Sequence, residues 1–144
     1  MSTIQVLGLD ELLQAFGNIS EIPATVKDKA LKEMSKKAAE RVKSQGETMR
    51  VRDMESSEHI LDEISVISPK LTESGGYADI TFNGSRRRGN TTTRNAAIAY
   101  INEFGKSSQP ARPFIGTAMS QNADEITATG ADILGDWIEN EYKK

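Results

Sequence analysis

The stretch "EFGKSSQPARPF", residues 103–114, decides how the second half of this chain folds. It places Phe104 and Phe114 around a glycine, two serines, two prolines and an arginine. Gly105 lets the chain reverse direction, and the prolines stiffen the return. Pro113 suits the first position of a helix. We therefore expect a strand-to-helix corner in which Phe114 enters the core and contributes about 2 to 3 kcal/mol on burial.

Four short segments upstream of the corner predict strands. They are "TIQVLG" at 3–8, "ILDEISVIS" at 60–68, "YADITF" at 77–82 and "AAIAYINEF" at 96–104. Short turns between the last three indicate an antiparallel meander. A short helix over "LDELLQAF", residues 9–16, is expected after the first strand.

Two long amphipathic patterns predict helices. The first begins at Pro23 and reaches about Gln45, with Gly46 at its end, and the second begins after Pro113 and is interrupted at Gly130. The apolar stripes are Val26, Ala30, Leu31, Met34, Ala38 and Val42 in the first helix, and Ile115, Ala118, Met119, Ile126, Ile133, Leu134, Trp137 and Ile138 in the second. The expected fold class is α+β, a small antiparallel sheet of three to four strands packed by two long helices.

A chain of 144 residues fits one domain, here residues 1–144. Residues 47–59, "ETMRVRDMESSEH", have no clean period and predict a mobile arm. Residues 83–95, "NGSRRRGNTTTRN", predict a long arginine-rich hairpin loop that is mobile in the isolated protein. Residues 139–144 predict a polar tail.

Composition excludes several classes of protein. The chain has no cysteine, which rules out disulfides, thiolate metal sites and a thiol nucleophile. His59 is the only histidine, so a serine hydrolase or a metal enzyme would have few candidate catalytic or metal-binding side chains. The first residues lack a basic start followed by an apolar run, and the longest clean apolar run is "AAIAYI". We expect a cytoplasmic protein that does not span a membrane.

The charge alternates in sign by segment, although the net charge is only -3. Residues 27–52 and 83–112 are mainly basic, whereas residues 53–79 and 113–144 are mainly acidic. Such blocks are typical of oppositely charged faces that meet within a fold or between copies. Solvated helix faces are the alternative explanation.

Catalytic and cofactor sites are not expected. His59 and Glu63 are four residues apart and could offer two ligands, but zinc needs more. The carboxylates of Glu58, Asp62 and Glu63 lack an apolar frame that would raise a pKa. The glycines near residue 75 do not follow a phosphate-binding order. We expect no enzyme activity, no metal and no cofactor, with His59 in a solvated loop.

The arginines Arg86, Arg87, Arg88 and Arg94 are candidates for partner contacts, because guanidinium groups bind phosphates or carboxylates through paired hydrogen bonds. Three interpretations stay open for them: a solvated tip, a protein contact and a DNA contact. The sequence pI of about 5.3 and the lack of a DNA-reading motif count against a specific DNA reader. Trp137 fits core packing better than an exposed interface anchor.

The order of residues in "AAIAYINEFGKSSQPARPFIGTAM", 96–119, resembles the signature of the head-to-tail joining proteins of tailed bacteriophages, also called neck or tail-completion proteins. In that family a strand ending in a Phe-Gly pair is followed by a variable loop, an Ala-Arg-Pro-Phe-like turn and a helix. The matching positions are Glu103, Phe104, Gly105, Pro110, Ala111, Arg112, Pro113 and Phe114.

The resemblance implies a structural virion protein without enzyme activity or cofactor. It would form a homo-oligomeric ring, a hexamer or alternatively a dodecamer, at the head–tail junction. Its partners would be a head-closure or connector protein and a tail terminator or tail tube protein, with DNA passing through the channel unread. The protein would be found in the virion, and in the host cytoplasm during assembly, without contact with a membrane.

Two other functions are weighed against this one. A DNA-binding accessory protein would use the loop of Arg86–Arg88, and a small hydrolase would need a catalytic cluster around His59.

Arg112 is the residue of the corner expected to have most freedom to contact a partner. Identical copies in a ring meet head to tail, so each copy needs two different complementary faces.

Overall fold

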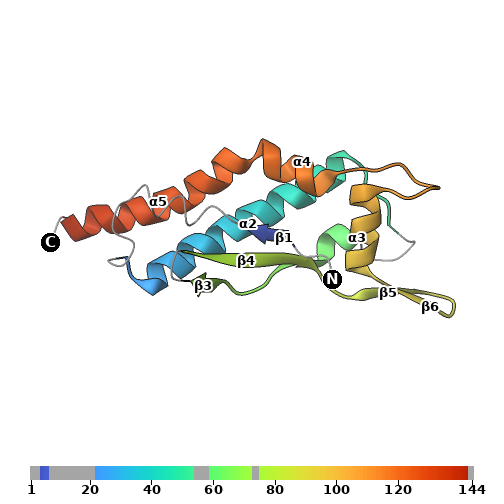
Figure 1. The fold of residues 1–144 in the computed structure, drawn as a ribbon, viewed down its shortest axis with the longest axis horizontal. Coiled ribbons are helices and arrows are strands. Elements are labelled where there is room, and N and C mark those ends of the chain that lie inside the picture. Colours follow the sequence, from blue (N-terminus) through green and yellow to red (C-terminus); the bar gives the residue numbers. More distant parts are fainter. Residues whose placement is uncertain (1–3, 7–21, 54–58, 73–74, 143–144) are drawn as a thin grey trace.

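A computed structural model of the chain describes residues 4–6, 22–53, 59–72 and 75–142. Its elements follow one another as β1 (Ile4–Val6), α2 (Ala24–Thr48), the 3-10 helix η2 (Ile60–Glu63), β2 (Ile64–Val66), β3 (Lys70–Thr72), β4 (Gly75–Phe82), β5 (Ser85–Arg88), β6 (Thr91–Arg94), α3 (Asn95–Phe104), α4 (Phe114–Gln121) and α5 (Ala123–Tyr142). The molecule is elongated, and α2 lies between the sheet and the α4–α5 layer (Figure 1). The expected α+β class, with antiparallel strands and two long helices, is confirmed.

The sheet is built around β4, with which β1, β2 and β3 each pair in antiparallel orientation. Ile80 lies opposite Ile4 on one side and Val66 on the other. Ile80 and its neighbour Phe82 are buried, because alternate residues of a strand point to the same face. That face of β4 packs on α2.

The middle layer, α2, supplies most of the main core. Ala30, Leu31, Met34 and Ala38 are fully buried and share one cluster with β4 and α5. The alanines leave room for neighbours on both sides of the helix, which agrees with the predicted stripe. No helix of the described residues has the length and hydropathy required to cross a membrane.

A second core cluster lies under the α3 end of the molecule. It joins Val42 of α2, Leu61 of η2, Phe82 of β4 and Phe114 of α4. The expectation that α2 ends at Gly46 is wrong, since the helix continues to Thr48. A Cβ at position 46 would lie 2.6 Å from Cδ2 of Leu61, so this glycine serves close packing instead.

The strand expected over 96–104 is wrong, because Asn95–Phe104 forms the helix α3. Its buried residues are Asn95, Ala96, Ile98, Ala99 and Asn102. This spacing of three, four and seven residues follows the helical period, not the alternation of a strand. Helix propensity agrees, since three of the ten residues are alanine. The corner of residues 103–114 therefore joins two helices.

The break in the C-terminal helical pattern lies at Asn122, not at Gly130 as expected. The Asn122 amide caps α4 by donating to the carbonyl of Ala118 at 2.8 Å. Gly130 is buried inside α5. The polar segment expected as a tail continues this helix as far as Tyr142, and its last two residues lie outside the described ones.

The remaining sequence predictions met mixed outcomes. The first strand is confirmed over Ile4–Val6, whereas the helix expected over 9–16 lies outside the described residues. The strand expected over 60–68 is in part the 3-10 helix η2, and its strand portion, Ile64–Val66, pairs with β4. Strand β3 was not anticipated. The strand predicted over 77–82 is longer in the structure, because β4 begins at Gly75 and includes Gly76. A Cβ at position 76 would lie 2.7 Å from the carbonyl oxygen of Lys70, so the close approach of β3 requires glycine there.

A polar contact joins α2 to α5 beside the core. Arg41 donates to Oε1 of Glu125, and Lys37 lies 4.0 Å from the same oxygen. The hydrogen bond from Arg41 is the main reason that the pKa of Glu125 lies below its usual range, and the positive charges of Arg41 and Lys37 add to it. Both side chains of the pair are more than a third exposed, so solvent screens their attraction.

We predict that Phe114→Ala lowers the free energy of unfolding by about 3 to 5 kcal/mol, because a buried aromatic is removed. The Phe114 ring is fully buried and meets Phe82 edge-on at 6.0 Å between centroids. Urea unfolding measures the change. Phe104→Ala is the matched control: this ring is 66% exposed, and its loss should change stability by less than about 1 kcal/mol. Equal effects of the two substitutions would contradict the placement of Phe114 in the core and of Phe104 on the surface.

We also predict that Glu125→Gln flattens the dependence of stability on pH in acid. The depressed pKa of folded Glu125 contributes stability above about pH 4.3, the value of an unperturbed glutamate, and this stability is lost as the pH falls through the folded value. Wild-type protein should therefore lose stability more steeply than the variant in acid. Urea titrations at a series of pH values measure both slopes. Asp124→Asn, next in sequence and without an ion pair in the described chain, is the control.

Candidate functional site

Asn102 holds the corner of residues 103–114 to the rest of the molecule. Its side chain is 1% exposed. Oδ1 accepts from the backbone N–H of Arg52 at 2.7 Å, and Nδ2 donates to the Arg52 carbonyl at 2.7 Å and to the Ile98 carbonyl at 2.9 Å. The Asn102 backbone carbonyl accepts from the N–H of Arg112. One residue thereby ties α3, the segment after α2 and the end of the corner together.

The next residue, Glu103, satisfies the start of α4. Its carboxylate accepts from the backbone N–H groups of Ile115 at 2.8 Å and Gly116 at 3.0 Å. These groups have no partner within the helix, and a negative charge is favoured at a helix N-terminus. Glu103 thus acts as a cap supplied by the preceding helix.

Gly105 and Pro113 set the backbone of the corner. Gly105 has φ 76° and ψ 179°, a region that residues other than glycine scarcely adopt. A Cβ there would also lie 2.8 Å from the nitrogen of Ala111. Pro113 has φ -75° and ψ 66°, an inverse γ-turn closed by Phe114 N–H donating to the Arg112 carbonyl at 2.7 Å. The predicted turn at Gly105 and the burial of Phe114 are confirmed, whereas Pro113, expected as the first helical residue, immediately precedes α4.

The loop tip within the corner closes on itself. Lys106 and Gln109 form an isolated antiparallel bridge with backbone hydrogen bonds of 2.9 and 3.0 Å. Pro110 and Ala111, in the segment that returns from the tip toward α4, are exposed. The tip is therefore presented to solvent, while its two ends are fixed by Asn102 and Gly105.

Arg112 is less free than the sequence predicts. Its backbone is bound to Asn102, its side chain is half-buried, and Nη1 is buried without a hydrogen-bond partner in the described chain. A contact of Arg112 with a partner stays a prediction.

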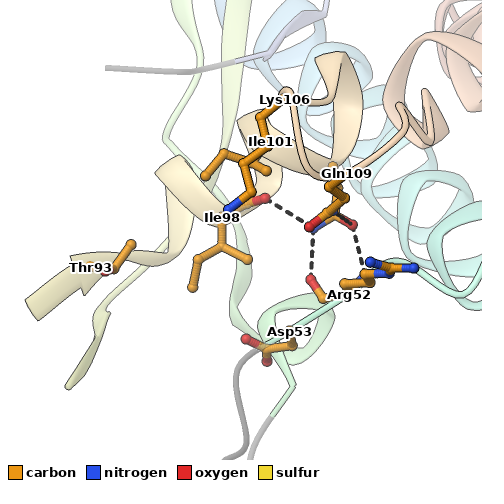
Figure 2. A pocket seen from close by; sticks show the side chains of 8 residues that line it. Arg52, Asp53, Thr93, Ile98, Ile101, Lys106 and Gln109 are labelled. Carbon is orange, nitrogen blue, oxygen red and sulfur yellow. Dashed lines mark hydrogen bonds between the residues drawn. The ribbon is translucent and has the colours of Figure 1, made fainter. Parts of the chain in front are cut away.

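A cavity of about 230 Å³ opens beneath the corner, lined by Arg52, Asp53, Thr93, Ile98, Ile101, Asn102, Lys106 and Gln109 (Figure 2). Ligand sites usually measure about 300 to 1,000 Å³. The amide of Asn102 belongs to the lining of this space, and it is already bound to the backbone of Arg52. This cavity is smaller than that range, and the Asn102 amide in its lining is already bound within the chain.

Residues 83–95 form the predicted hairpin, β5 paired with β6. Its root is held by an ion pair, Arg86 Nη2 to Asp53 Oδ2 at 3.1 Å, in which the side chains are 11% and 6% exposed. The same oxygen accepts from the N–H of Ile60 at 2.8 Å. Arg86 is therefore bound within the chain and is not presented to a partner.

The other hairpin arginines differ from Arg86. Arg87 is exposed and donates from Nε to the carbonyl of Gly89 at 3.1 Å, within the turn. Arg94 is exposed and precedes the first residue of α3. Arg88 belongs to β5. Contacts of Arg87, Arg88 and Arg94 with a partner stay predictions.

The outer face of α3 carries an exposed aromatic pair, which sequence reasoning missed. Tyr100 and Phe104 are 53% and 66% exposed, and their ring centroids lie 4.7 Å apart at 47°. They are four residues apart, the spacing of neighbours on a helix surface. Residues four apart in a strand do not touch, so the strand predicted for this segment gave no reason to pair Tyr100 with Phe104. A helix prediction would have indicated the pair.

His59 caps the 3-10 helix η2, since its Nδ1 accepts from the N–H of Leu61 at 3.2 Å. Lys43 lies 3.0 Å from Asp62 and holds the pKa of that carboxyl below its usual range, mainly through a hydrogen bond. No group of three or more potential metal-binding side chains was found in the part of the chain described. Trp137 is half-buried and packs against the main core.

We predict that Asn102→Ala lowers the free energy of unfolding by about 2 to 4 kcal/mol, because Arg52 loses both backbone partners. Amide hydrogen exchange at Arg52 should accelerate as well. Asn122→Ala is the matched control, since its amide makes a single bond to Ala118, and should cost less than about 1 kcal/mol. Equal stability of the two variants would show that Asn102 does not hold the corner.

Comparisons with known proteins found no matching family model, no matching curated protein and no matching solved structure. Support for a function therefore comes from the residues of the corner and from the surface around it.

Proposed function

We propose that this chain is a structural ring protein at the head–tail junction of a tailed phage. It joins the head-closure connector to the tail terminator or tail tube and lets DNA pass without reading it. The observation that carries the proposal is the order of residues from Glu103 to Phe114, within the stretch 96–119 that resembles the signature of head-to-tail joining proteins.

The roles of the signature residues in the fold support the proposal. Glu103, Gly105, Pro113 and Phe114 each fix the corner through a cap, a backbone conformation or a buried ring. The resemblance assigns these residues to a turn that leads into a helix, and in this fold they form such a turn before α4. The resemblance implies a strand before the Phe-Gly pair, whereas this chain has the helix α3. The proposal therefore rests on the corner and α4, not on the preceding element.

The surface supports assembly into a ring of identical copies. Tyr100 and Phe104 expose apolar rings at one end of the elongated molecule, and the acidic C-terminal half of α5 lies at the other (Figure 1). A cyclic assembly needs two different faces of this kind. A hexamer, or alternatively a dodecamer, forms part of the proposal.

A DNA-binding accessory protein is the second candidate, and it has less support. One of the three arginines in its loop Arg86–Arg88, Arg86, is engaged with Asp53 inside the molecule. Arg87 and Arg94 are exposed and could still contact phosphates. Retention on DNA that falls with salt and disappears in an Arg87→Ala/Arg94→Ala variant would favour this candidate, because phosphate contacts release counterions.

We predict that deleting the gene from the phage or prophage that encodes it yields DNA-filled heads and free tails that do not join. Supplying the wild-type chain in trans should restore whole virions, which electron microscopy and plaque counts measure. Whole virions that assemble normally without the chain, or purified virions that lack it, would refute the proposal.

A further inference from the structure

We propose that the aromatic pair of α3, Tyr100 and Phe104, docks on the acidic C-terminal half of α5 in a second copy of this chain. The inference rests on the proposed function, since it names the two faces through which copies in the ring meet. The two aromatics are called the α3 ridge below.

The α3 ridge is the most exposed apolar feature of the described surface. The large hydrophobic residues with more than a third of their surface exposed are Ile67, Leu71, Tyr100 and Phe104, and the last two pack ring against ring. Scattered exposed apolar residues are normal, whereas aromatic residues gathered in one place are typical of the centre of an interface. Pro110 and Ala111, exposed on the return of the corner, extend the apolar surface near Gly105.

An unpaired positive charge lies beside the α3 ridge. Lys106 follows Phe104 by two residues, is exposed, and has no ion pair within the described residues. The one carboxylate of the corner, Glu103, is occupied by the start of α4. Two ridges facing each other would therefore repel, and an acidic partner is favoured.

The C-terminal half of α5 has the complementary charge. Asp132, Asp136, Glu139 and Glu141 are exposed, and the only basic residues after Pro113 in the sequence, Lys143 and Lys144, lie outside the described residues. Asp132 and Asp136 form no ion pair in the described chain. The negative end of the α5 dipole adds to the attraction for cations.

The same stretch of α5 also leaves space for an aromatic side chain of a second copy. A Cβ added at Gly135 would meet nothing within 4 Å, so the backbone between Asp132 and Asp136 is open to a partner. This helix end and the α3 ridge lie at opposite ends of the long axis (Figure 1). A contact between them is head to tail, and repetition closes into a ring when the rotation allows.

The first test measures self-association of the full chain by sedimentation velocity and light scattering. Phe104→Ser and Asp136→Lys should each weaken it at least about 10-fold, as expected when an interface anchor or a close charge pair is lost. The controls are Leu71→Ser, an exposed apolar residue of β3, and Lys32→Glu, an exposed charge of α2, and neither should change association. The double variant Lys106→Glu/Asp136→Lys should recover part of the affinity, because both charges are exchanged.

The second test mixes the two single variants. Phe104→Ser copies keep only the acidic face and Asp136→Lys copies keep only the ridge, so each alone should stay monomeric and the mixture should stop at one-to-one dimers. No dimers in the mixture, wild-type association of either variant, or a wild-type chain that is monomeric up to about 1 mM would overturn the inference.

The deletion test separates this inference from the proposed function. Unjoined heads and tails on deletion, together with unaltered association of both variants, would refute the docking faces and leave the phage function standing. Normal virions on deletion, together with weakened association of both variants, would refute the phage function and leave the docking faces standing.

Discussion

The pairing of the Asn102 side chain with the backbone of Arg52 is the constraint on which the α3 end depends. The side-chain amide of Asn102 hydrogen-bonds both the backbone N–H and the backbone carbonyl of Arg52, as a neighbouring β-strand would. Buried backbone groups need such partners, and no sheet reaches this point of the chain. Because α3 is fixed there, Glu103 is positioned to cap α4, and the aromatic pair is turned to the opposite side of the helix.

The sequence predicts those parts of the structure that local chemistry controls. Glycine and proline at 105 and 113 have restricted uses in any chain, so the corner and the burial of Phe114 could be foreseen. The stripe from Ala30 to Val42 likewise follows from periodicity alone. The arginine hairpin follows from its turn residues.

The contacts that sequence reasoning missed join residues far apart. Asn102 reaches 50 positions back to Arg52, and Arg86 reaches 33 back to Asp53. Nothing in the neighbourhood of Asn102 or Arg86 marks such a partner. Gly46 and Gly130 were misread for a related reason. Each weakens a helix by about 1 kcal/mol in isolation, and burial against neighbouring elements outweighs that cost here.

The three-layer arrangement around α2 also bears on how the chain folds as it is made. Leu31 and Met34 share their core with Ile126 and Leu134, which are synthesised about a hundred residues later. Until α5 leaves the ribosome, one side of α2 has no partner and its apolar stripe is open to other chains. The nascent protein therefore reaches its native core late, after almost all of the described chain has been translated.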